Sequence, residues 1–269
     1  MRSKPIRVMF IGTCRMHDPA HLLQNESGFD VRTTPHRLHT TSQTLRFLRH
    51  MQGLESYQSD MAHLISDYAS KCIYEDGHTR QRVLDELDRI RAIWPTFDAF
   101  VIEISALREP FAKHGDRTIV VNNFSARDQE KYADIIMREA AVGLSLPVLK
   151  IDVEILSPSA LIKRMAAIRQ TLGQRPIIWV SHQRPPSTDP EYETVNKVRS
   201  HLSVSLKAGA QALSDMFFDP STIAAEMGQE VFFQGGGRDL DHLTQEAAKV
   251  LSARYAAMLI RTLQIATSK

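Results

Sequence analysis

Three residues near the two ends of the chain could together perform acyl chemistry. Cys14 follows the apolar run 6–12, and Asp239 and His242 stand three positions apart in the segment 239–244. A carboxylate at this spacing on a tight turn can hold the Nδ1 atom of the imidazole and leave Nε2 free as a base. A thiol beside such a base is a nucleophile that can form a covalent acyl intermediate. The three residues therefore define a candidate Cys-His-Asp site.

Each of these residues also has a structural interpretation. The positive end of the helix that follows the strand-to-helix turn at Cys14, together with Arg15 and His17, favours the reactive thiolate. Free cysteines are, however, also common as small buried residues. Asp239 or Asp241 could similarly be the cap of the final helix, in a solvated loop. The residue pattern by itself leaves both pairs of interpretations open.

Strand and helix patterns alternate along the chain, and these elements must position the three residues. Apolar, β-branched segments predict strands at 6–12, 29–34, 97–105, 116–124, 146–153, 175–182 and 229–234. Helical spacing of apolar residues predicts helices at 42–51, 57–69, 79–94, 125–141, 157–173, 190–213 and 243–263. This alternation predicts an α/β fold with a mostly parallel sheet covered by helices. We expect one domain over residues 1–269, with a helical insertion at about 53–94.

Polar residues follow several predicted strands, at the edge where ligands bind in open α/β sheets. They are Gly12, Thr13 and Arg15 after the first strand, Ser105 and Arg108 after the third, and His182 after the sixth. We expect these residues to line the site by binding substrate or stabilising an oxyanion. His182 could equally be an ordinary histidine at a strand end.

The loop 35–41 after the second predicted strand is rich in cationic residues. Arg37 and His39 could bind an anionic group, and a plain polar loop is the alternative. His36 and His39 also have the spacing of a metal-binding pair. The sequence offers no evident third or fourth ligand, so we expect no metal.

Composition excludes several classes of protein. The chain has 269 residues, 43% apolar and 24% charged, with a net charge of +2 and no basic run, which gives no case for a nucleic-acid partner. No apolar stretch approaches the roughly 20 residues of a membrane span, and the first is shorter than the roughly 7–15 of a signal peptide. With only Cys14 and Cys72, we expect a cytoplasmic protein in which Cys72 is structural. The sequence carries no signal for an oligomeric state.

The order of these motifs resembles the SGNH (GDSL-type) hydrolase superfamily. That family carries a Gly-Asp-Ser motif after its first strand and an Asp-x-x-His-Leu motif before its last helix. Here "GTC" (12–14) and "DLDHLT" (239–244) stand at the two places. Cys14 replaces the family's serine and Thr13 its aspartate, and "EISALRE" (103–109) stands where the family has a Gly-x-Asn-Asp motif. The "GTCR" layout is also similar to a Gly-Asn-Cys-Gln motif in proteins related to capsule-polysaccharide acyltransferases.

The resemblance implies a three-layer α/β/α sandwich with a flavodoxin-like sheet and Cys14, His242 and Asp239 as its catalytic residues. The Cys14 amide, with Ser105, Arg108 or Arg15, would supply the oxyanion donors. The implied reaction is acyl transfer or acyl-ester hydrolysis on a small-molecule or carbohydrate substrate. No cofactor is expected to be required, and acyl-CoA fits as a donor because thioesters exchange acyl groups readily. The alternatives are an ordinary esterase or thioesterase, or a non-catalytic module that binds a carbohydrate or a partner.

Overall fold

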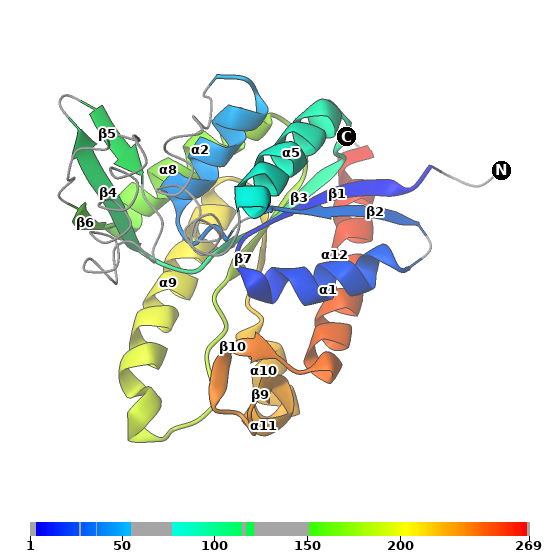
Figure 1. Ribbon diagram of the computed structural model, residues 1–269. Coiled ribbons are helices and arrows are strands. Elements are labelled where there is room, and N and C mark those ends of the chain that lie inside the picture. The colour runs from blue at the N-terminus through cyan, green and yellow to red at the C-terminus, as the bar shows by residue number, and fades with distance from the viewer. Residues whose placement is uncertain are drawn as a thin grey trace.

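A five-stranded parallel sheet forms the centre of the computed structural model, which describes residues 4–26, 28–35, 37–54, 77–114, 117–120 and 151–267 (Figure 1). The strand order is β2-β1-β3-β7-β8, and every neighbouring pair is parallel. The strands are β1 (Ile6–Ile11), β2 (Phe29–Thr33), β3 (Ala99–Ile104), β7 (Ile177–Ser181) and β8 (Met216–Phe218). The predicted mostly parallel sheet is confirmed, with β8 as a strand that the sequence patterns did not indicate.

Helices cover both faces of this sheet, and the alternation of side chains along β1 shows why. Val8 and Phe10 join one apolar core, whereas Met9 and Ile11 join the other. The first core is closed by α1 (Cys14–Gln24), α10 (Ser221–Met227), α11 (Gln229–Phe232) and α12 (Gln245–Thr267). The second is closed by α2 (Thr41–Met51), α5 (Gly77–Ile93), α8 (Pro158–Leu172) and α9 (Glu193–Ala212). The predicted three-layer α/β/α sandwich is therefore confirmed.

A second, antiparallel sheet of order β5-β4-β6 lies beside α2 and α8 (Figure 1). Its strands are β4 (Arg108–His114), β5 (Arg117–Val120) and β6 (Ile151–Ile155). Arg108, which follows the third predicted strand and was expected to line the site, is the first residue of β4 and pairs with Ile155. The predicted strand 116–124 contains β5, and the described part of the predicted strand 146–153 overlaps β6.

The segment before the last helix differs from its prediction. Residues 229–232 form α11 rather than a strand, and only β9 (Phe233–Gln234) is extended. β9 pairs antiparallel with β10 (Asp239–Leu243), so the Asp-x-x-His segment is a strand and not a loop. Three successive glycines at 235–237, all with positive φ, make the turn between these strands.

Most predicted helices agree with the structure within a few residues. The helix predicted at 79–94 is α5, which ends at the short 3-10 helix η1 (Trp94–Thr96), and the helix predicted at 190–213 is η2 (Pro190–Tyr192) followed by α9. The helices predicted at 57–69 and 125–141, most of the predicted insertion, and Cys72 lie outside the described residues. Within the described ranges, no helix combines the length and apolarity that crossing a membrane requires.

Candidate active site

Cys14 is the first residue of α1, at the carboxyl end of the central strand β1. The strand-to-helix turn is made by Gly12 and Thr13, with Thr13 as the N-cap residue of α1. Gly12 is required for a steric reason, since a Cβ atom there would lie 2.7 Å from the Cβ of Glu103. The turn therefore packs directly on β3, and it leaves the Cys14 side chain partly accessible.

The side chains of Asp239 and His242 are hydrogen-bonded to each other on β10. The Nδ1 atom of His242 lies 2.8 Å from Oδ2 of Asp239, and both side chains are substantially exposed, 53% for His242 and 42% for Asp239. The hydrogen bond from His242 lowers the pKa of Asp239 below its ordinary value. Neither aspartate caps α12. Thr244 does so, because its Oγ1 atom accepts from the amide of Ala247 at 3.1 Å.

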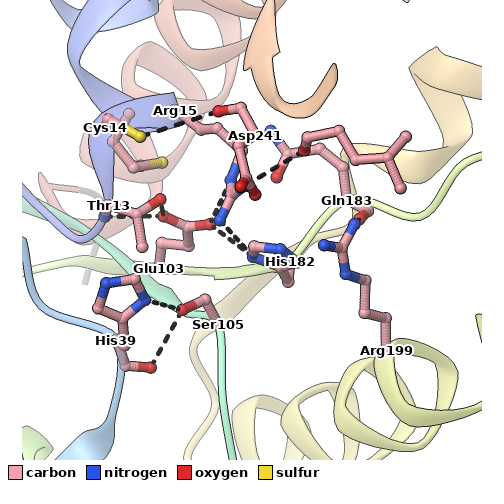
Figure 2. Close-up of polar contacts among 12 residues, drawn as sticks. Thr13, Cys14, Arg15, His39, Glu103, Ser105, His182, Gln183, Arg199 and Asp241 are labelled. Atoms are coloured by element: carbon pink, nitrogen blue, oxygen red, sulfur yellow. Dashed lines mark hydrogen bonds and ion pairs between the residues drawn. The ribbon is translucent and has the colours of Figure 1, made fainter. Parts of the chain in front are cut away.

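The thiol of Cys14 contacts the strand that carries the Asp239–His242 pair. The Sγ atom of Cys14 lies 3.8 Å from the backbone carbonyl oxygen of Asp241, at hydrogen-bonding distance for sulfur (Figure 2). This carbonyl belongs to the peptide bond that leads to His242. The predicted nucleophile therefore lies against the strand that carries the predicted base and its carboxylate.

A buried polar network lies beneath Cys14, with the carboxylate of Glu103 on β3 at its centre (Figure 2). Oε2 of Glu103 accepts from the amide of Thr13 at 2.9 Å and from its hydroxyl at 2.6 Å. Oε1 faces Nδ1 of His182 at 3.3 Å and Nε of Arg15 at 3.8 Å. Glu103 is 1% exposed, so these partners replace water for a fully buried charge.

Arg15 extends this network from Glu103 to β10. Its Nη1 atom donates to the side chain of Asp241 at 2.9 Å and to the carbonyl of Leu240 at 3.3 Å. Its Nη2 atom lies 3.1 Å from Nδ1 of His182. That Nδ1 atom can serve only one neighbour at a time, as acceptor from Arg15 or as donor to Glu103.

Burial and charge shift the pKa values of this network in opposite senses. Burial alone would raise the pKa of Glu103, but the hydrogen bond with His182 and the charge of Arg15 outweigh it and hold the pKa well below its usual range. Burial, with the charge of Arg15, lowers the pKa of His182 far below its ordinary value. Near neutral pH Glu103 is therefore ionised and His182 is neutral.

Arg199 on α9 is a second cation close to this network. Its Nη1 atom donates to the carbonyl of Gln183 at 2.7 Å (Figure 2). Burial, followed by the charge of Arg15, lowers the pKa of Arg199 to about 10, and it remains a cation at neutral pH.

The loop after β2 crosses the ends of β1 and β3. The amide of Leu38 donates to the carbonyl of Gly12, and the amide of Ser105 donates to the carbonyl of His39, both at 2.9 Å. The Nδ1 atom of His39 also lies 2.9 Å from Oγ of Ser105, so two predicted site residues form a pair. Arg37, from the same loop, is close enough to His17 to contribute to lowering its pKa, behind burial and the neighbouring His21.

The structure thus brings together most of the predicted site residues, but not all. Glu103 is surrounded by four of them, Gly12, Thr13, Arg15 and His182. Arg108 makes none of these contacts with Glu103 and is exposed on β4. His36 lies outside the described residues. In the parts of the chain that the structure describes, no three His, Cys, Asp or Glu side chains cluster as a metal site would require.

Sequence reasoning missed Glu103, Asp241 as an ion-pair partner, and Arg199. A signal for Glu103 was present, because it is the one charged residue in the buried run AFVIEI of β3. A charge inside a central strand needs a partner, and that requirement could have pointed to Arg15. Arg199 carries no comparable signal, since it lies on a partly exposed helix.

The fold and the placement of Cys14 and the Asp-His pair agree with an α/β domain of the SGNH type. The sequence model of the TviD N-terminal domain family matches residues 6–257. The chain therefore belongs to this family, and the resemblance predicted from its motifs is confirmed. The use of cysteine as the nucleophile stays a prediction.

Several solved structures match the chain at low sequence identity and with TM-scores below 0.5. The salicylyl-acyltransferase SsfX3 from a tetracycline biosynthetic pathway has 11% identity and a TM-score of 0.48, over 98% of this chain and 57% of that chain. This chain thus spans little more than half of that protein. The aryl esterase of M. smegmatis has 11% identity and a TM-score of 0.40, over 95% and 99%. The acetylxylan esterase Axe2 of Geobacillus stearothermophilus has 10% identity and a TM-score of 0.41, over 98% and 96%. No curated protein matches the sequence.

Proposed function

We propose that this chain is an acyl-transferring or acyl-ester-hydrolysing enzyme that works through a Cys14 thioester. The observation that carries the proposal is the 3.8 Å contact of Cys14 Sγ with the carbonyl of Asp241. It sets the thiol against β10, where the Asp239 carboxylate orients His242 at 2.8 Å. A nucleophile, a base and a carboxylate that orients the base are the parts that covalent acyl catalysis needs.

The reaction has two steps that share one base. His242 takes the proton of the Cys14 thiol, and the thiolate attacks the acyl carbonyl carbon of the donor. The leaving group departs with the proton that His242 returns, and a thioester remains on Cys14. In the second step His242 takes a proton from an acceptor hydroxyl or from water. The acceptor oxygen attacks the thioester carbon, the carbon–sulfur bond breaks, and the thiol is restored.

Two groups are suited to stabilise the oxyanion of each step. The amide of Cys14 belongs to the first turn of α1, where amides have no acceptor within the helix. The Thr13 amide already donates to Glu103, so it is not available to stabilise an oxyanion. The Ser105 hydroxyl, at the end of β3 and held by His39, is the proposed second donor. In acyl transfer, removing one such donor typically costs about 3–4 kcal/mol of barrier.

His182 is a weaker candidate for the base than His242. Burial and Arg15 lower the pKa of His182 far below its ordinary value, whereas general bases work best with a pKa near the working pH. Its Nδ1 atom also faces the permanent donor Arg15 at 3.1 Å. The half-exposed ring of His242 has Nδ1 bound to Asp239, which favours Nε2 for proton transfer.

A thioester on cysteine favours transfer over hydrolysis, because it readily yields its acyl group to a hydroxyl. We therefore propose an acyl thioester such as acyl-CoA as the donor. The proposed acceptor is a hydroxyl group of a small molecule or a carbohydrate. The chain needs no cofactor for this chemistry.

Intact-mass spectrometry tests the proposal directly. The protein is incubated briefly with a panel of short acyl-CoAs and activated acyl esters, beside the Cys14→Ala variant. We expect one acyl group to be added to the wild-type chain and none to the variant. If no donor adds mass and none is consumed, the proposal fails, and a non-catalytic module that binds a carbohydrate or partner becomes the better interpretation.

A further inference from the structure

We propose that Glu103 is a positioning residue that acts through Arg15 to hold β10, and with it His242, in register with Cys14. The proposal deepens the proposed function and rests on it, since the register matters only if these residues react together. Glu103 itself is buried beneath the turn, and we assign it no contact with the substrate.

The contacts run from the two residues that flank the nucleophile to the strand that carries the base. Glu103 binds the Thr13 amide at 2.9 Å and its hydroxyl at 2.6 Å, which fixes the residue directly before Cys14. The same carboxylate faces Arg15, the residue directly after Cys14, at 3.8 Å. Arg15 then binds the Asp241 side chain at 2.9 Å and the Leu240 carbonyl at 3.3 Å. One carboxylate therefore orients both neighbours of the nucleophile and, through one of them, the strand of the base.

Steric fit and burial make this arrangement rigid. The missing Cβ of Gly12 lets the turn sit on the Cβ of Glu103, and an alanine there would meet it at 2.7 Å. The Arg15 side chain is 5% exposed, whereas its partner Asp241 on β10 is 72% exposed. The exposed strand is thus anchored to the core by a cation that is itself buried.

A simpler explanation is that Glu103 only satisfies the polar groups of its turn. Glu109 provides a measure of that role, because it is also buried, 3% exposed, and performs the same task elsewhere. It accepts from the amide of Ser42 at 3.0 Å and from the Thr41 hydroxyl at 2.5 Å, at the start of α2. The contacts of Glu103 differ in reaching β10 through Arg15.

The matched variants Glu103→Gln and Glu109→Gln separate the two roles. Each removes a buried charge and keeps the size of the side chain. Turnover is measured with the donor that acylates Cys14, and hydrogen exchange is followed in peptides that cover 238–244 and 40–45. We expect Glu103→Gln to lower kcat about 10- to 100-fold with KM changed less than about threefold, because a small misplacement can cost that much. Its 238–244 peptide should exchange faster.

The control variant should show the opposite pattern. Glu109→Gln should keep kcat within about threefold of wild type, and its 40–45 peptide alone should exchange faster. A normal kcat in Glu103→Gln, or unchanged exchange in 238–244, overturns the proposal. Equal losses of kcat in both variants overturn it as well, since they would assign both carboxylates a general structural role.

A second variant keeps the test decisive if Glu103→Gln folds poorly. Asp241→Ala removes the side chain that Arg15 binds at the exposed end of the same chain of contacts, and it leaves the buried charge pair intact. We expect it to lower kcat about 5- to 10-fold, to speed exchange in 238–244, and to leave the unfolding temperature unchanged. Normal exchange and normal kcat in this variant contradict the proposal. If no donor acylates wild-type Cys14, the proposed function fails, and the exchange data still decide whether Glu103 holds β10.

Discussion

The two acid–base groupings of this site differ mainly in their exposure to water. The pair on β10, Asp239 and His242, has side chains 42% and 53% exposed. The network below it is almost dry, with Glu103 at 1% and the side chains of Arg15 and His182 at 5% and 6%. Each grouping contains a carboxylate and a histidine, but their surroundings are opposite.

This difference in exposure assigns catalysis to the pair on β10 and positioning to the buried network of Glu103. A half-exposed histidine can exchange protons with a substrate and with water, as a base must. A buried carboxylate paired with an arginine stays ionised and is costly to disturb, so it holds geometry instead. The carboxylate–histidine pattern alone therefore does not reveal which pair performs catalysis, and burial distinguishes them.

Removing the exposed histidine is expected to have the largest effect on activity. His242→Ala should lower kcat at least about 10³-fold, as loss of a catalytic base does in comparable acyl-transfer sites. The unfolding temperature should stay within about 2 °C, since an exposed side chain contributes little to stability. Turnover and thermal melts check both statements, with the exposed His201 on α9 as control. His201→Ala should leave kcat unchanged. Similar losses of kcat in the two variants would contradict a specific catalytic role for His242.

Removing the buried carboxylate should affect stability most. Glu103→Ala leaves the buried cation Arg15 without the carboxylate that faces it at 3.8 Å and the Thr13 amide without its acceptor. It should cost about 3–5 kcal/mol of unfolding free energy. Asp239→Ala, on the exposed pair, should leave the urea midpoint unchanged and lower kcat. Equal midpoints in the two variants would show that burial does not separate the two groupings.

A smaller effect is expected from one hydroxyl of the buried network. Thr13→Val removes the 2.6 Å bond to Glu103 and should cost about 1.5–3 kcal/mol, as for hydrogen bonds to charged groups. Thr44 is an apt control, because it is also buried but its hydroxyl has no hydrogen-bond partner among the described residues. Urea unfolding of Thr44→Val should show no loss. A loss equal to that of Thr13→Val would assign the effect to packing.

The pH dependence of stability should follow the buried histidine. Because the pKa of His182 is lowered in the folded state, the unfolded chain binds its proton first as the pH falls below about 6.5. Stability is therefore fully present above that pH and is lost on acidification. Between pH 7 and pH 5 wild type should lose about 1–2 kcal/mol more than His182→Asn, measured by urea unfolding. Asp239→Asn should show the same pH dependence of stability as wild type. If His182→Asn also lost as much stability as wild type between pH 7 and pH 5, His182 would not be the source of this pH dependence.

The sequence predicted those parts of the site that depend on local pattern. The apolar runs of β1, β3 and β7 predicted three strands of the sheet. The polar residues at the ends of these strands indicated Cys14 and His182 as site residues. The Asp-x-x-His pair needs only residues three apart, and it forms as expected, although on a strand. The local pattern also placed the described predicted helices closely enough to predict a mostly parallel sheet covered by helices, whereas the three-layer sandwich followed from the family resemblance.

What the sequence did not predict depends on partners far apart in the chain. Glu103 is 90 residues from Thr13, and Arg15 is 226 residues from Asp241, so no local spacing reports either contact. The strand β4 was missed because it pairs with β6, from Arg108 with Ile155 to Ala112 with Ile151, and no local spacing reports this pairing either. Residues 229–232 have the composition of a strand, but α11 buries Phe232 against the face covered by α12.

The most direct test of a single reactive centre at Cys14 is its rate of alkylation by iodoacetamide at neutral pH. Peptide mapping follows Cys14 and, as an internal reference, Cys72 in wild type and in His242→Ala. We predict that Cys14 reacts at least about 10-fold faster than Cys72 in wild type, because a neighbouring base promotes the thiolate. The advantage should disappear in His242→Ala. Equal, slow rates in wild type, or a fast rate that survives the loss of His242, would contradict the proposed partnership of the two residues.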